Sequence, residues 1–166
     1  MEKHTLVALM ENRPGVLNRV SSLFRRRNYN IESLSVGHSE SLGISRMTIV
    51  VNGDERIVEQ VVKQLEKLIN VTDVINVSAD PIVSRELALI KVKAVPGSRS
   101  EIMELAHVFR ARVIDVAAAS LTVEITGPED RVNSLIGLLQ PYGIEELART
   151  GRVAMVRGGN GSNEQH

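Results

Sequence analysis

A repeated order of predicted strands and helices constrains the fold of this chain more than any other feature. Over residues 5–78, short apolar runs indicate strands, and apolar side chains at helical spacing indicate helices. Together they predict the order strand, helix, strand, strand, helix, strand. The same order recurs over residues 86–156, and a Pro-Gly pair follows the first strand of each copy, at positions 14–15 and 96–97. This order is that of the ferredoxin-like fold. We therefore expect an α+β protein made of two ferredoxin-like βαββαβ domains in tandem.

The ends of the apolar patterns and the turn residues between them give the predicted boundaries. Strands are expected at residues 5–10, 30–36, 45–51, 71–78, 86–94, 112–117, 121–126 and 144–156, with Gly151 as a candidate bend in the last. The first helix is expected to begin at Pro14, since a missing N–H costs nothing at the first helical position. Further helices are expected around residues 57–69, 102–109 and 132–139. The domains are expected at residues 1–80 and 81–158, with a disordered glycine-rich tail at 159–166.

The first predicted strand, residues 5–10, is apolar on both faces, a pattern typical of a strand that is buried on both. Two helices on one face of a small sheet leave the other face and the sheet edges to be covered. Pairing with a second copy of the chain would cover them. We therefore expect at least a homodimer, formed through residues 1–80.

The composition argues against several classes of function. The chain has 20 basic and 20 acidic residues, so charge gives no reason to expect nucleic acid or an anionic membrane as a partner. There is no cysteine, and the four histidines show no metal-ligand spacing. No apolar run reaches the roughly 20 residues that span a bilayer, and no leader pattern precedes the first strand. We expect a cytoplasmic protein with no metal site and no catalytic residues.

The turn after the first strand, Asn12-Arg13-Pro14-Gly15, places the N-terminus of a helix directly after a strand. Free backbone N–H groups and the helix dipole at such a point can bind a small anion such as a carboxylate. Gly15 has no side chain, so a ligand could approach the backbone closely. An ordinary strand–helix turn is the simpler alternative, because such turns are common.

Several stretches of the sequence are similar to one known family. Residues 11–17, Glu-Asn-Arg-Pro-Gly-Val-Leu, resemble the first turn of an ACT domain, a ferredoxin-like module that binds amino acids. Residues 27–37, 45–49 and 64–71 are more specific and resemble the regulatory small subunit of acetolactate synthase, also called acetohydroxyacid synthase. The second half agrees with the same family at residues 85–87, 109–111, 114–116, 125–127 and 148–151. The resemblance covers residues 3–158.

The resemblance implies a regulatory role without catalysis. In this family a separate large subunit carries thiamine diphosphate, magnesium and FAD, and it catalyses the first common step of branched-chain amino acid biosynthesis. The small subunit stimulates that large subunit and confers feedback inhibition by valine, or in some members by leucine or isoleucine. We therefore expect no cofactor on this chain, and the acetolactate synthase large subunit as its partner.

The resemblance also implies an effector site shared between the ACT domains of two chains. The positions carried over are Asn12, Gly15, Val16 and Leu17 from one chain, with Asn30 and Ile31 from the other. Backbone amides around Gly15 would hold the carboxylate of valine, and the two asparagines would offer oxygens to its ammonium group. Ile31 would line a pocket for the side chain, although plain core packing explains this residue equally well.

Two other functions stay open at the level of sequence. One is a free-standing amino-acid sensor that works with a different partner. The other is an acylphosphatase-like hydrolase, which has the same fold and uses an arginine in the first strand–helix turn, a position that Arg13 could fill. The residues around Arg13 do not match the corresponding turn of acylphosphatases, and a hydrolase of that kind would leave the second domain unexplained.

Overall fold

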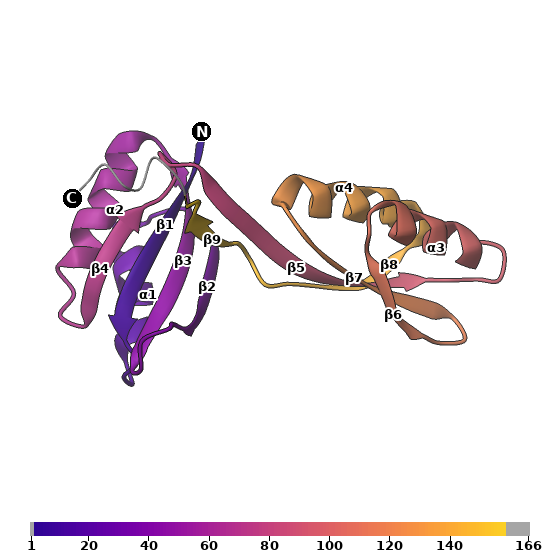
Figure 1. Cartoon of the computed structure of the whole chain (residues 1–166), viewed down its shortest axis with the longest axis horizontal. Helices are drawn as coiled ribbons and strands as arrows, with labels where there is room; N and C mark the ends of the chain where they lie inside the picture. The colour runs from indigo at the N-terminus through magenta and orange to yellow at the C-terminus, as the bar shows by residue number, and fades with distance from the viewer. Residues whose placement is uncertain (1, 159–166) are drawn as a thin grey trace. The chain divides into compact units, whose positions relative to one another are not determined.

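The computed structural model describes residues 2–158 and divides into two compact units (Figure 1). The first unit comprises the chain up to Val83 together with the residues from Arg152 onward, and the second comprises Ser84–Gly151. Both contain the predicted order of strands and helices. The fold class of two tandem βαββαβ units is therefore confirmed.

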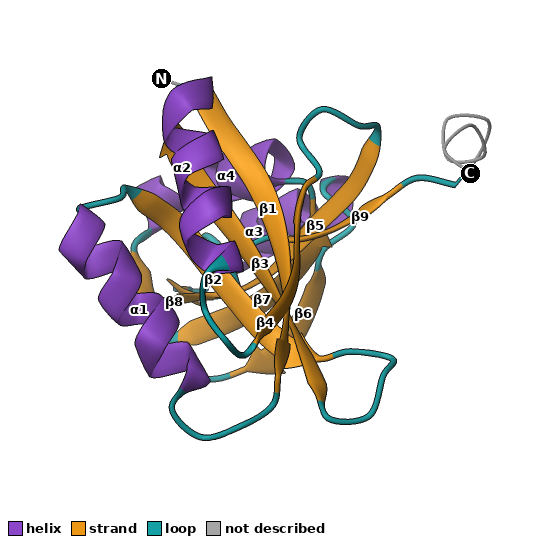
Figure 2. Ribbon diagram, turned by 90° about the vertical axis from the view of Figure 1, so that its left-hand side faces the viewer, coloured by secondary structure: helices purple, strands orange, loops and turns teal. Residues whose placement is uncertain are grey.

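The first unit is a four-stranded antiparallel sheet with two helices on one face, both on the same side of the strands in Figure 2. Its elements are β1 (Glu2–Glu11), α1 (Val16–Arg27), β2 (Ile31–His38), β3 (Ile44–Gly53), α2 (Glu55–Glu66) and β4 (Val71–Asn76). The sheet order is β2-β3-β1-β4, so the first strand of the chain is central. Alternate residues of β1 enter the core beneath the helices, namely Leu6, Ala8 and Met10.

The opposite face of β1 is covered by the chain's own C-terminal segment. Val7 is buried against Val77 and Ala154, which lie in a small second cluster of apolar side chains. Ala154 belongs to β9 (Val153–Val156), which pairs with β5 (Ile82–Lys93). Arg46 Nη2 on β3 donates a hydrogen bond to the Ala154 carbonyl oxygen at 2.7 Å. Burial of the first strand on both faces is confirmed, but at Val7 it requires no second copy of the chain.

The second unit repeats the architecture with the order β6-β7-β5-β8. After β5 it contains α3 (Arg99–Val108), β6 (Arg112–Val116), β7 (Ser120–Gly127), α4 (Glu129–Leu139), a 3₁₀ turn (Gln140–Tyr142) and β8 (Ile144–Arg149). Its core is a separate cluster in which Ile90, Leu121 and Leu135 are fully buried. One charged pair is partly enclosed: Arg149 Nη2 donates to Glu86 Oε1, and the side chain of Glu86 is 7% exposed.

Two predicted details differ from the structure. The first helix begins at Val16 rather than at Pro14, because Gly15 adopts a left-handed conformation (φ 86°) that a regular helix cannot contain. The predicted strand at residues 144–156 is two strands, separated by a bend at Gly151 (φ 79°).

The C-terminal residues of the chain differ from the predicted domain boundary. Residues 152–158, which the sequence analysis assigns to the second domain, group with the first unit. The predicted tail at 159–166 lies outside the described residues. Residues 2–158 include no helix with the length and hydrophobicity of a membrane span.

Candidate functional site

The turn between β1 and α1, residues 12–15, exposes its backbone. Asn12 N donates to the Gly43 carbonyl oxygen at 2.8 Å, which fixes the start of the turn. Gly15 is the N-cap residue of α1, with φ 86° and ψ −12°. A Cβ atom added to Gly15 would have no atom within 4 Å, so the space in front of this glycine is open. The turn therefore combines a conformation that favours glycine with room for a ligand.

Backbone N–H groups in the first turn of α1 have no hydrogen-bond acceptor among the described residues. Val16 N reaches the Arg13 carbonyl oxygen only at 3.4 Å. The N–H groups of Leu17 and Asn18 make no hydrogen bond within residues 2–158. No side chain caps α1 and no acidic residue lies in its first turn, whereas an aspartate caps α2. The positive end of the α1 dipole is thus available to an anion.

A polar network ties this turn to the start of β4. Glu11 N donates to the Asn70 carbonyl oxygen at 2.9 Å, and Asn70 Nδ2 donates to Glu11 Oε2 at 3.1 Å. Arg19 Nη1, on α1, donates to Asn70 Oδ1. Arg13 Nε lies 2.8 Å from Glu11 Oε2, so its guanidinium group has an acidic partner. The network links the end of β1, helix α1 and the residue before β4, and Arg13 joins it through an exposed ion pair.

Glu11, Arg19 and Asn70 support the turn but are not among the site residues predicted from the sequence. Glu11 and Asn70 are 59 positions apart, and their contact exists only because β1 and β4 are neighbours in the sheet. Asn70 lies immediately before a predicted strand, where an asparagine is ordinarily a turn residue. No signal in a single sequence could have connected the three residues.

The predicted site residues of the turn differ in how they are exposed. Asn12 and Gly15 are exposed, and Leu17 is 46% exposed, which is unusual for a large apolar side chain. Val16 is 4% exposed and belongs to the core, so only its backbone faces the turn. The group offers N–H donors, one side-chain amide and one apolar side chain.

The remaining two predicted residues, Asn30 and Ile31, lie at the other end of the same sheet. Glu11, just before the turn, pairs with Ile44 at the start of β3. Ile31 pairs with Val51, which is seven residues further along β3. At about 3.4 Å per residue, this register separates the two groups by about 24 Å. One chain therefore cannot bring its own Asn30 to its own turn, and a site that uses both groups needs two chains.

The chemistry that this arrangement supports is binding of a small anion at the turn. Among residues 2–158 no group of three His, Asp or Glu side chains could hold a metal ion. Ile31 is half-buried and packs against the core of the first unit, with part of its side chain still exposed. The assignment of Asn12, Gly15, Val16, Leu17, Asn30 and Ile31 to an effector site remains a prediction.

The sheet order, the two helices on one face and the glycine of the first turn are features of the ACT class of regulatory domains. Comparison with protein families agrees with this class. The family model described as an AHAS small subunit-like ACT domain matches residues 6–73.

Matches along the whole chain identify a narrower family than the ACT class. The family model described as the small subunit of acetolactate synthase matches residues 85–158. The chain is 57% identical, over 156 residues, to a probable acetolactate synthase small subunit of Archaeoglobus fulgidus, covering 94% of this chain and 98% of that one. It is 49% identical to the acetolactate synthase small subunit of Bacillus subtilis, covering 94% and 91%. The chain belongs to the family of acetolactate synthase small subunits, and the resemblance seen in the sequence is confirmed.

A solved structure supports the same assignment. The crystal structure of the acetolactate synthase small subunit from Thermotoga maritima superposes with a TM-score of 0.90 at 41% sequence identity. The match covers 96% of this chain and all of that one. Both units of the fold are therefore shared with a member of the family.

Proposed function

We propose that this chain stimulates a separate catalytic large subunit of acetolactate synthase and makes that subunit sensitive to feedback inhibition by valine. Membership of the small-subunit family and the ACT domain support a regulatory subunit. The thiamine diphosphate, magnesium and FAD of the reaction belong to the large subunit in this proposal. The complex works in the cytoplasm, and this chain contributes no catalytic residue.

The observation that carries the effector site is the open turn at Gly15. The N–H groups of Leu17 and Asn18 lack partners among the described residues, and they lie at the positive end of a helix dipole. The carboxylate of an amino acid fits donors of this kind. The exposed side chain of Leu17 provides an apolar wall next to them.

The second half of the proposed site comes from a second chain. Asn30 and Ile31 lie about 24 Å along the sheet from the turn of their own chain, as the strand register requires. In a twofold-symmetric homodimer the turn of each chain can lie against the Asn30 and Ile31 of its partner, and the symmetry makes the two contacts equivalent. The Asn12 and Asn30 amide oxygens then accept hydrogen bonds from the ammonium group, and Leu17 and Ile31 enclose the branched side chain.

Leucine and isoleucine differ from valine in the size of the apolar side chain that the pocket must hold. Each has one methylene more than valine, and one methylene in an apolar pocket changes binding by about 10- to 200-fold. The size of the space between Leu17 and the partner's Ile31 therefore sets the order of preference.

Reconstitution with the large subunit tests the function directly. Acetolactate formation from pyruvate is measured with the large subunit alone, with this chain alone and with both, each with and without valine. We expect no product from this chain alone, a higher rate from the mixture, and inhibition by valine only in the mixture. Acetolactate formed by this chain alone would contradict the proposal. Failure of the two chains to co-purify would instead favour a free-standing amino-acid sensor.

A further inference from the structure

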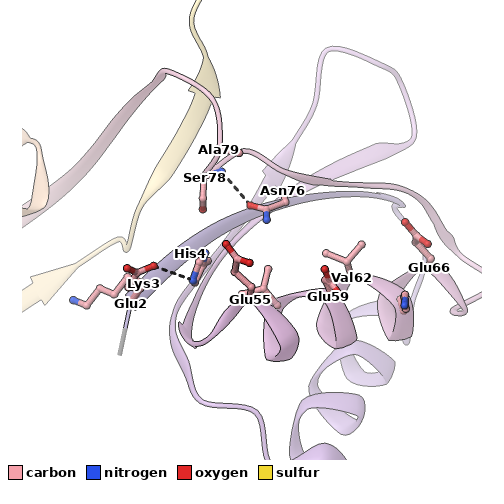
Figure 3. A pocket seen from close by; sticks show the side chains of 12 residues that line it. Glu2, Lys3, His4, Glu55, Glu59, Val62, Glu66, Asn76, Ser78 and Ala79 are labelled. Carbon is pink, nitrogen blue, oxygen red and sulfur yellow. Dashed lines mark hydrogen bonds and ion pairs between the residues drawn. The ribbon is translucent and has the colours of Figure 1, made fainter.

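A groove with a volume of about 630 Å³ lies in the first unit and shares no residue with the proposed effector site. The start of β1, the exposed face of α2 and residues 76–79 form its walls (Figure 3). His4 pairs with Val51 in the sheet, whereas Glu11 pairs with Ile44, so the groove and the turn at Gly15 lie at opposite ends of β1. The volume is that of an ordinary small-molecule site.

A buried histidine at this groove has an unsatisfied nitrogen. His4 is 9% exposed, and its Nε2 atom has no hydrogen-bond partner within the described chain. The Glu2 Oε2 atom is 3.9 Å away, close enough for an ion pair with a protonated imidazole (dashed line in Figure 3) but beyond hydrogen-bond length. In Figure 3 the side chain of His4 lies between Glu2 and the carboxylate of Glu55. A buried polar atom without a partner is costly, and a ligand that hydrogen-bonds to it would remove that cost.

The groove is acidic along its length. Glu55, Glu59 and Glu66 project from α2 in a row, and Glu2 lies at the His4 end (Figure 3). At 1.5 Å per residue, the first two glutamates of the row are about 6 Å apart and the last two are about 10 Å apart along the helix axis. Val62 lines the groove between these carboxylates with a half-buried side chain, and Val58 beneath it is 2% exposed and belongs to the core.

Two lysines also line the groove, and they do not reverse its charge. Lys3 lies 3.8 Å from Glu32, a residue outside the groove, and Lys63 lies on α2 beside the glutamates. Four carboxylates against two ammonium groups leave a net negative site. An anion is therefore disfavoured. A bare metal ion is also disfavoured, since no three His, Asp or Glu side chains of the described residues are grouped closely enough to hold one.

We propose that this groove binds a linear aliphatic diamine or polyamine. Its ammonium groups would donate to the spaced carboxylates and to His4 Nε2, while its methylene segments would lie against Val62. Spacing, charge and apolar contact together favour a chain of alternating cationic and apolar segments over a compact cation. The groove uses none of the residues that are proposed to bind valine.

The test is a titration of the full-length chain with spermidine, followed by the imidazole signals in NMR spectra. A His4→Gln variant assigns the signal of His4 among the four histidines. We expect the His4 signal to shift and to saturate, and the same titration with Mg²⁺ at equal ionic strength to leave it in place. A Glu59→Gln variant should weaken spermidine about fivefold, and Glu59→Gln with Glu66→Gln about twentyfold, from the loss of one or two exposed charge contacts.

A matched control lies in the other unit, where Glu145 is an exposed glutamate. Glu145→Gln removes the same net charge and should leave the affinity for spermidine unchanged. An absent or unsaturable His4 shift, an equal response to Mg²⁺, or equal weakening by Glu145→Gln would each overturn the proposal. The spermidine titration tests the groove, and inhibition of the holoenzyme by valine tests the effector site. A negative result in one measurement therefore does not contradict the other proposal.

Discussion

Replacement of Gly15 by aspartate places a negative charge where the effector carboxylate is proposed to bind. A side chain at this position enters open space, since no atom lies within 4 Å of the added Cβ. Two like charges about 4 Å apart repel by about 4 kcal/mol at an effective dielectric near 20, and by about 1 kcal/mol in bulk water. At about 1.4 kcal/mol per tenfold, these limits correspond to a loss of valine affinity between about fivefold and about a thousandfold. Enclosure of the ligand between two chains favours the upper part of this range.

The backbone of Gly15 requires a matched control. Its φ of 86° is strained for any L residue, at a cost of about 1–2 kcal/mol. Gly15→Asn introduces a side chain of the same shape at the same φ, and asparagine and aspartate both tolerate this region better than most residues. The ratio between the two variants therefore isolates the effect of the charge. Aspartate near a helix N-terminus also contributes a favourable 0.3–1 kcal/mol or so, which offsets part of the strain.

The assay is acetolactate synthase activity of the reconstituted holoenzyme over a range of valine concentrations. The half-inhibitory concentration should rise modestly in Gly15→Asn and much further in Gly15→Asp. Activity without valine and the unfolding temperature of each variant report on assembly and on folding. Equal half-inhibitory concentrations in the two variants would refute the charge argument, and inhibition like that of the unaltered chain would show that valine does not bind at this turn.

Three further predictions follow from the packing and the register. The Gly15→Asp chain and the Asn30→Ala chain, each tested by itself, should lose inhibition by valine. An equal mixture whose subunits exchange should recover about a quarter of the valine sites, because half of the dimers are mixed and each mixed dimer has one intact site. Calorimetry with valine measures the recovery, and no recovery would mean that the two residues do not share a site across chains. Ala154→Asp should destabilise the first unit by about 3 kcal/mol in denaturant unfolding, since it buries an unpaired charge, whereas Val153→Asp, at a position 49% exposed, should change little. Arg149→Ala should lower the free energy of unfolding of the second unit by about 2 kcal/mol, because the buried carboxylate of Glu86 loses its partner. This figure lies below that for a fully buried ion pair because the arginine is partly exposed. An unchanged unfolding midpoint would contradict the prediction.

A fragment of residues 1–80 would contain every proposed effector contact, but it lacks Ala154 and Ile82, which help to cover Val7. We expect this fragment to unfold at a lower temperature than the first unit of the full chain. Calorimetry with valine on the full chain is therefore the sounder measurement.

The sequence by itself determined the number, type and order of the elements. Apolar periodicity and turn residues are local properties, so they could be followed along the chain without knowledge of its contacts. They located both βαββαβ copies, the bend at Gly151 and the open glycine of the first turn. The stretch at residues 27–37 added the family, which the comparisons confirm.

Only the tertiary structure decided how distant residues meet. The pairing register of β1, β2 and β3 places Asn30 and the turn at Gly15 at opposite ends of one sheet. The return of β9 to the first unit covers Val7 from within the same chain, where the apolar pattern alone had suggested a second copy. The partners of Glu11 and the unsatisfied nitrogen of His4 likewise depend on side chains far away in the sequence. Local patterns specify which elements form, but the burial of one element against another is fixed by long-range packing, which a single sequence does not record.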